Sequence, residues 1–170
     1  TLEPNTLFYK HPPSLPEDDL IAEMQIIGQE FIHTSCYTQY EVSAYAQAKQ
    51  ECQHNLNYWE FGDYIGIGAG AHGKVTQPDK SVTRYQKYRQ PAQYIQQAQS
   101  MQPRSQTSQL STADLTFEFM LNALRLKQGF STELFSHRTG LADTAIQSGL
   151  ELAISQDLLT INNNHISPTD

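Results

Sequence analysis

Residues 52–73 read CQHNLNYWEFGDYIGIGAGAHG and bring together side chains that could bind a porphyrin. An imidazole nitrogen can ligate iron, and tyrosine and tryptophan rings offer flat apolar faces on which a macrocycle can stack. One short stretch contains an imidazole and both kinds of ring together with an asparagine: His54, Asn55, Tyr58 and Trp59. The cluster indicates a heme site with His54 as the metal ligand. A tight turn whose rings fill a barrel end, with His54 bonded to a backbone carbonyl, would account for the same residues.

The glycine-rich run that follows could bring bare backbone close to a ligand. Gly66, Gly68 and Gly70 carry no side chain, so their amides and carbonyls can approach an adenine, a ribose or a carboxylate. A phosphate-binding loop would need a helix or a Lys-Ser/Thr pair after the glycines, and neither signal is present. We expect this run and His54 to share one interior pocket.

Other kinds of site find little support in the sequence. A zinc site made of Cys52, His54 and His72 lacks the second close pair of ligands that marks structural zinc. The Gly-x-Ser-x-Gly motif of a serine nucleophile is missing from the sequence. Glu3 follows the predicted end of a strand, where ligands bind in α/β barrels. An Asx-type turn within residues 3–6 would explain that stretch equally well.

The composition excludes several classes of protein. The 170 residues carry a net charge of −7 with only 11 Lys and Arg, too few for a surface that grips nucleic-acid phosphates. No apolar run approaches the roughly 20 residues that span a bilayer. The first residues, TLEPNTLFY, lack the features of a signal peptide. Cys36 and Cys52 fit no disulfide framework, so we expect free, buried thiols in a soluble, cytoplasmic protein.

The first part of the chain has the pattern of an α/β fold. A Pro-rich loop over residues 4–16 leads into an acidic turn and a helix that ends near Ser35. Its apolar residues recur at helical spacing: Leu20, Met24, Ile27 and Phe31. Residues 40–45, YEVSAY, alternate in polarity and favour a strand. The order strand, loop, helix, strand predicts the last portion of an α/β barrel.

A hairpin, a connector and a winged helix are expected next. Pro78-Asp79-Lys80 predicts a turn between two strands, and Pro91 opens a helix. Residues 102–112 carry almost no apolar side chains and are expected to be an exposed connector. Three helices then precede a hairpin, as a winged helix requires: about Phe117–Leu124, Ser131–Gly140 and Asp143–Gln156, with the turn at Asn162-Asn163-Asn164.

These elements divide the chain into residues 1–101, a linker over residues 102–113 and a winged-helix-like domain over residues 114–170. The predicted third helix, DTAIQSGLELAISQ, carries two acidic residues and no basic one. It therefore lacks the phosphate contacts that hold a recognition helix on DNA. We expect this domain to serve packing or protein contact.

Several stretches carry a family resemblance, in this order: LEPNTLFYKHPP, YEVSAYA, HNLNYW, GDYIGIGAGAH and the final lobe. Together they resemble the C-terminal half of the oxygen-independent coproporphyrinogen III oxidase family of radical S-adenosylmethionine proteins. The resemblance covers essentially the whole chain. Residues 54–59, HNLNYW, match the His-Asn-x-x-Tyr-Trp pattern of the heme chaperone (HemW-type) branch. The resemblance implies an α/β fold, α+β in this portion, with part of a TIM-type barrel before a winged-helix-like domain that has a β-hairpin.

For function, the resemblance implies a protein that binds heme and passes it to heme-accepting respiratory proteins. It implies that heme is bound by four side chains: His54, Asn55, Tyr58 and Trp59. It also implies that the backbone at about Leu2 and His72 contacts S-adenosylmethionine. Two other functions stay open: oxidative decarboxylation of coproporphyrinogen III to protoporphyrinogen IX, and a structural interaction module. Exposed barrel edges would also favour a homodimer.

The chain departs from the family at the iron–sulfur cluster. Radical S-adenosylmethionine chemistry uses a [4Fe–4S] cluster held by a Cys-x-x-x-Cys-x-x-Cys run, whereas this chain has only Cys36 and Cys52. The family carries that run in its N-terminal half. We therefore expect the chain to be a fragment that is not a catalyst by itself.

Overall fold

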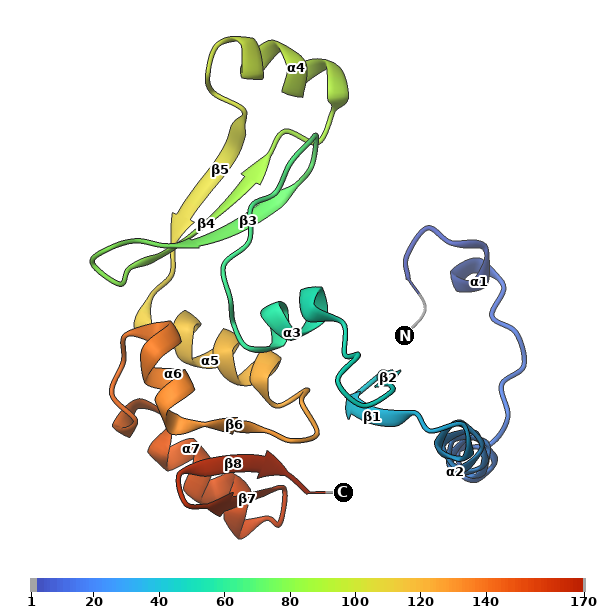
Figure 1. Ribbon diagram of the computed structural model, residues 1–170. Helices are drawn as coiled ribbons and strands as arrows, with labels where there is room; N and C mark the ends of the chain where they lie inside the picture. The colour runs from blue at the N-terminus through green and yellow to red at the C-terminus, as the bar shows by residue number, and fades with distance from the viewer. Residues whose placement is uncertain (1–2, 170) are drawn as a thin grey trace. The chain divides into compact units, whose positions relative to one another are not determined.

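The fold is that of a computed structural model, which describes residues 3–169 (Figure 1). The chain forms two compact units, residues 1–38 and 39–170. Helices and strands are mixed, which confirms the expected fold class. Leu2, the expected end of a barrel strand, lies outside the described residues. No helix within residues 3–169 is long and apolar enough to cross a membrane.

The first unit contains two helices. α1 (Leu7–Lys10) is a single turn in a stretch that was expected to be a loop. It forms because the side-chain oxygen of Thr6 caps it by accepting the N–H of Tyr9. α2 (Asp18–Thr34) confirms the predicted helix and begins with two acidic residues, which suit the positive end of the helix dipole.

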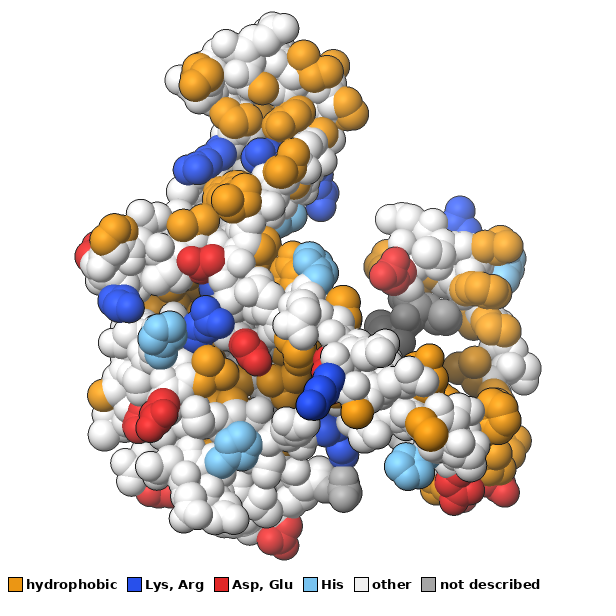
Figure 2. Space-filling view, in the orientation of Figure 1, with side chains coloured by type: hydrophobic (Ala, Val, Ile, Leu, Met, Phe, Trp, Pro, Cys, Tyr) orange, Lys and Arg blue, Asp and Glu red, His pale blue; other side chains and the backbone are white. Residues whose placement is uncertain are grey.

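The apolar stripe of α2 is exposed. No residue of α2 is buried, and the stripe side chains are between 48% and 73% exposed: Leu20, Met24, Ile27 and Phe31. Figure 2 shows hydrophobic side chains gathered over this helix. Helices in proteins gain most of their stability by burying such a face. The stripe is therefore suited to packing against another surface.

The second unit begins with two short strands instead of the single strand expected over residues 40–45. β1 (Thr38–Glu41) and β2 (Ala44–Ala46) pair with each other. The chain reverses between them because the Glu41 carboxylate accepts both the N–H and the hydroxyl of Ser43, at 3.1 and 3.0 Å. A local side-chain hydrogen bond therefore overrides the alternating pattern.

α3 (Gln53–Trp59) carries the HNLNYW motif, which is helical and not a tight turn. It is followed by an antiparallel sheet in the order β3-β4-β5, with α4 between the last two strands (Figure 1). The bounds are β3 His72–Thr76, β4 Val82–Lys87, α4 Pro91–Gln99 and β5 Arg104–Gln109. The predicted hairpin around residues 78–80 and the helix at Pro91 are confirmed.

β5 corrects the connector expected over residues 102–112. The strand is exposed along its whole length, as expected, but it pairs with β4, with Arg84 opposite Ser108. Backbone hydrogen bonds form this ladder whatever the side chains, so a polar strand can complete the sheet. The lobe boundary at residues 102–113 stays a prediction.

The remaining elements have the order of a winged helix, as predicted. They are α5 Thr112–Ala123, β6 Phe130–Ser131, α6 Thr132–Thr139, α7 Thr144–Ser155, β7 Leu159–Asn162 and β8 His165–Pro168, with the strands in the order β6-β8-β7. Gly140 ends α6 with a φ of 72°, in the left-handed region. Asn163 and Asn164 both have positive φ, as the two-residue turn of a tight hairpin requires.

One buried core joins the sheet to the winged helix. Phe119 of α5 is 0% exposed, and its ring centroid lies 5.8 Å from Phe61 and 5.1 Å from both Phe130 and Phe135. Phe61 and Val82 precede residues 102–112 in the chain, whereas the other three rings follow them. Both parts of the second unit therefore depend on the same core.

Candidate functional site

α3 presents the motif residues on two different faces. Residues four apart on a helix lie on the same side, so His54 falls with Tyr58, and Asn55 with Trp59. His54 is exposed, and its ring meets the Tyr58 ring edge-on with 4.9 Å between centroids. The Tyr58 ring lies 4.6 Å from that of Tyr64. We call His54, Tyr58 and Tyr64 the aromatic row.

The other face of α3 is an anchor. The guanidinium of Arg125, just beyond α5, lies 4.3 Å from the Trp59 ring and donates to Glu41 Oε2 at 3.0 Å. Asn55 Nδ2 donates to the hydroxyl of Tyr40 at 3.3 Å. Asn55 and Trp59 therefore hold α3 against β1 and the end of α5. Contact of these two residues with heme stays a prediction.

Tyr64 ties the aromatic row to the sheet. Its backbone forms an isolated antiparallel bridge with Lys74 of β3, with two N–H···O hydrogen bonds of 3.0 Å. Burial raises the pKa of the Tyr64 phenol, so its ring stays uncharged near neutral pH. The row therefore ends on the edge of the sheet in a neutral, flat ring.

The glycine run must have glycine at the point where its backbone passes close to β3. A Cβ on Gly66 would overlap the carbonyl oxygen of His72, so only glycine fits there. The Gly66 N–H donates to the Tyr85 hydroxyl at 3.1 Å, and the Gly70 N–H donates to the Tyr88 carbonyl at 2.8 Å. The backbone makes the close approach expected of this run, with the hairpin as its partner. Contact with a small ligand stays a prediction.

A buried lysine joins the end of α3 to the sheet. Lys74 Nζ donates to the Phe61 carbonyl at 2.8 Å and lies 3.5 Å from Asp63 Oδ1. The Asp63 carboxylate also accepts the N–H and the hydroxyl of Thr76, at 2.9 and 2.8 Å. Burial lowers the pKa of Lys74, and the Asp63 charge offsets this only in part. Burial would raise the pKa of Asp63, but the Thr76 hydrogen bonds and the Lys74 charge outweigh it and hold that pKa below its ordinary value.

Replacing Asp63 by asparagine is expected to remove the part of the free energy of unfolding that the wild type loses as the pH falls. A carboxyl with a lowered folded pKa stabilises the fold above its unfolded value, 3.8, and this is lost as the pH falls through the folded pKa. The wild type should therefore be more stable than Asp63→Asn near neutral pH, and the difference should shrink below about pH 4. Urea unfolding across this range measures it, with Asp19→Asn on exposed α2 as the control. A difference that stays constant into strong acid would contradict the expectation.

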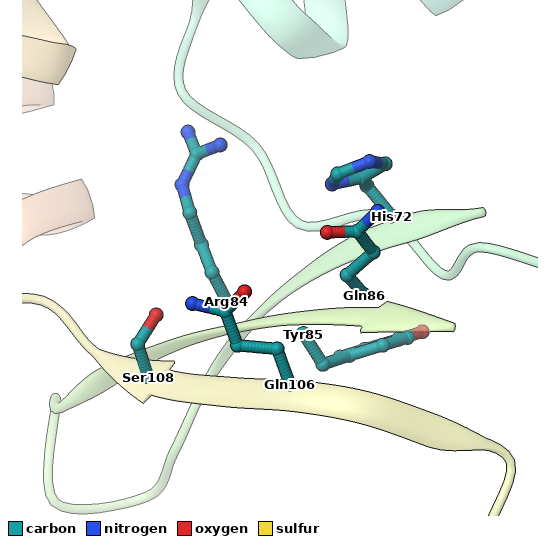
Figure 3. A pocket seen from close by; sticks show the side chains of 6 residues that line it. All are labelled: His72, Arg84, Tyr85, Gln86, Gln106 and Ser108. Carbon is teal, nitrogen blue, oxygen red and sulfur yellow. The ribbon is translucent and has the colours of Figure 1, made fainter. Parts of the chain in front are cut away.

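His72 lies at a hollow of about 200 Å³ on one face of the sheet (Figure 3). Directly paired residues of antiparallel strands share a face. The register therefore places five polar lining residues on the same side: His72, Arg84, Gln86, Gln106 and Ser108. Figure 3 shows the Tyr85 ring on the other side of the strand. All five side chains can donate hydrogen bonds, so this hollow suits an acceptor.

The structure shows the surroundings of Glu3 and of the two cysteines. Glu3 is exposed, and its carbonyl accepts the hydroxyl of Thr6 at 2.8 Å in a local turn. Cys36 and Cys52 are free, as expected, but exposed instead of buried, and they belong to different units. Among residues 3–169, no three His, Cys, Asp or Glu side chains are grouped to hold a metal ion.

The interior pocket expected around His54 is corrected by the structure. The ring is exposed because Asn55 and Trp59 occupy the inward face of α3. Sequence reasoning also missed Tyr64 and Arg84. Arg84 could have been found by counting forward from the predicted turn, since the hairpin register sets it opposite Lys74. Tyr64 had no such signal, because its bridge to β3 is an isolated one.

Comparison with known proteins finds a matching family model and curated relatives. Residues 110–170 match the family model described as HemN C-terminal domain. The chain is 44% identical, over 94% of its length, to heme chaperone HemW of Escherichia coli strain K12, and 39% identical, over 95%, to heme chaperone HemW of Haemophilus influenzae. It covers 41% of each, so it spans about two fifths of the length of these relatives.

A solved structure has the same fold. It is titled coproporphyrinogen III oxidase (HemN) from Escherichia coli, a radical SAM enzyme. The TM-score is 0.60 over 91% of this chain and 38% of that one, with 16% sequence identity. The names of the curated relatives favour the heme chaperone interpretation over the oxidase and over a purely structural module. The chain belongs to the coproporphyrinogen III oxidase-like family, in its heme chaperone (HemW-type) branch.

Proposed function

We propose that the chain is the heme-handling part of a heme chaperone, which binds heme at the aromatic row and passes it to heme-accepting respiratory proteins. The HNLNYW motif and the names of the curated relatives support this. The activity of the whole protein is part of the proposal, because the chain spans about two fifths of those relatives. We place the protein in the cytoplasm, where two free thiols stay reduced.

The observation that carries the proposal is the exposed His54 at the end of the aromatic row. An exposed imidazole can offer a ring nitrogen to iron without displacing packed side chains. Tyr58 and Tyr64 follow it at ring separations of 4.9 and 4.6 Å along the row and supply flat faces for a macrocycle. An open site of this kind also suits a cargo that must be released again.

Replacing His54 by alanine is expected to weaken hemin binding about tenfold, the equivalent of about 1.4 kcal/mol, because the iron loses its protein ligand. Hemin titration followed by the Soret band measures both the affinity and the ligation of iron. His137→Ala, which removes an exposed histidine from α6, is the matched control and should leave both unchanged. Equal affinity and an unchanged Soret spectrum for His54→Ala would rule out this ligand.

The family implies S-adenosylmethionine and a [4Fe–4S] cluster in addition to heme. Cys36 and Cys52 do not fit the cluster, because a cluster of this type takes more than two cysteine ligands. We therefore assign no catalytic step to this chain. For S-adenosylmethionine, we propose backbone contacts at about Leu2 and His72. Of these two, His72 lies at the start of β3.

A further inference from the structure

We propose that the hollow on the β3-β4-β5 sheet receives carboxylate side chains of the tetrapyrrole, with Arg84 as the ion-pairing residue. This inference rests on the proposed function and adds a second part to the same site. The aromatic row would hold the macrocycle, and the polar hollow would fix its acidic edge.

The two parts lie on the same side of the sheet. Lys74 pairs with Tyr64 on one side and with Arg84 on the other, so all three residues occupy one row across the sheet. Directly paired residues share a face, so the Tyr64 ring and Arg84 point to the same side. They are two strand spacings apart, about 10 Å. Lys74 between them is buried, so a side chain of a ligand on the Tyr64 ring would have to pass around it to reach Arg84.

The side chains of the hollow match a carboxylate. Five polar side chains on this side line the hollow, and all of them can donate hydrogen bonds: His72, Arg84, Gln86, Gln106 and Ser108. No Asp or Glu is among the lining residues. Arg84 is positioned from one side by Glu118, whose Oε2 lies 2.6 Å from Arg84 Nη2. Within residues 3–169 the buried Nε of Arg84 has no hydrogen-bond partner. Because this Nε is buried, a carboxylate in the hollow would pair with the part of the Arg84 side chain that stays exposed, 36% of it.

Arg84 is a cation that a ligand on this face can reach. Lys74, its neighbour in the row, is 2% exposed and is engaged by Phe61 and Asp63. Glu118 neutralises part of the Arg84 charge, and Arg84 keeps 36% of its side chain exposed. We therefore expect a moderate contribution of Arg84 to affinity, with its geometry set in advance by Glu118.

The size of the hollow suits the carboxylate side chains of the ligand and not its macrocycle. Pockets that enclose a whole drug-sized ligand measure about 300–1,000 Å³. The hollow measures about 200 Å³, enough for a carboxyl-ended side chain but too small for a porphyrin ring. The ring would remain outside, on the aromatic row and beside Ile65 and Ile67, which are 76% and 85% exposed. Apolar side chains exposed to this degree next to flat rings suit an apolar ligand surface.

The test compares hemin with hemin dimethyl ester, which has the same ring and iron but no free carboxylates. The wild-type chain should bind hemin more tightly than the ester. Arg84→Gln should weaken hemin binding about tenfold and leave ester binding unchanged, since only the acid can pair with Arg84. Arg104→Gln is the matched control, because Arg104 stacks on the Tyr85 ring at 4.5 Å on the other side of the sheet. It should change neither affinity.

A second variant guards against loss of folding. Arg84→Gln leaves Glu118 without its partner, so Arg84→Gln combined with Glu118→Gln removes both charges together. The double variant should fold and show the same selective loss of hemin affinity. Equal losses for hemin and ester, or no loss for either, would overturn the assignment of the hollow.

Three further outcomes distinguish failure of this inference from failure of the proposed function. If Arg84→Gln weakened binding of S-adenosylmethionine and left hemin binding unchanged, the hollow would belong to that ligand's carboxylate and the proposal would be overturned. If the wild type bound neither hemin nor its ester, the proposed function itself would fail, and this inference with it. Tight, equal binding of hemin and ester by the wild type would overturn the inference alone.

Discussion

Replacing Arg125 by methionine is expected to lower the free energy of unfolding by about 3 kcal/mol. Its partner Glu41 has a side chain only 3% exposed, and removing one member of a buried pair typically costs about 3–5 kcal/mol. The lower end applies because Ser43 continues to donate two hydrogen bonds to Glu41. Methionine retains apolar contact with Trp59 but removes the charge and the hydrogen bonds from Arg125 to Glu41 and Ser43. Urea unfolding measures the loss.

The double variant Glu41→Gln with Arg125→Met separates the buried charge from the shape of the site. If the cost of Arg125→Met comes from an unpaired carboxylate, a neutral amide at position 41 should recover most of it. Trp59 is the only tryptophan, and the guanidinium lies 4.3 Å from its ring, so its fluorescence reports on this contact directly. An Arg125→Met chain as stable as the wild type would show that Arg125 does not hold the anchor face of α3.

The elements with strong local signals could be predicted from the sequence. α2 was visible from apolar residues at helical spacing and from its acidic first turn. The β3-β4 hairpin and the β7-β8 hairpin were visible from their turn residues, and Gly140 marked the end of α6. In each case the chain's own local chemistry fixes the element, so neighbours in the sequence are enough to find it.

The elements that depend on distant partners could not be predicted in the same way. β5 is polar on both faces, so it has no alternation to mark it, and only its pairing with β4 makes it a strand. The stretch over residues 40–45 does alternate, but the Glu41 carboxylate turns the chain at Ser43. Long-range pairing therefore determines the structure of β5, and a local polar contact determines that of residues 40–45.

The residues of the candidate site were easier to find than their arrangement. His54, Asn55, Tyr58 and Trp59 could be named from their types, yet their division between an exposed row and an anchor face required knowledge that the segment is helical. The short helix has no apolar period that predicts it. The hollow around Arg84 is formed by three strands, one of which was read as a connector.

Replacing Phe119 by alanine is expected to cost about 3–5 kcal/mol, the largest effect expected here on stability. Its ring is 0% exposed and touches three other aromatic rings edge-on, so truncation leaves a cavity in the centre of the core. Phe117→Ala is the matched control, because Phe117 lies on the same helix but is 67% exposed. An exposed truncation of this kind should change stability by less than about 0.5 kcal/mol.

The same variant tests whether the winged helix and the rest of the second unit unfold together. Phe119 belongs to α5, whereas Trp59 belongs to α3, on the other side of the predicted linker over residues 102–113. Because Phe61 packs on Phe119 and its carbonyl accepts Lys74 Nζ, the cavity should loosen the sheet and α3 as well. Trp59 fluorescence and far-UV circular dichroism should therefore shift together to lower urea concentration. A fluorescence transition left unmoved by Phe119→Ala, while the dichroism transition shifts, would show that the predicted lobes unfold independently despite their common core.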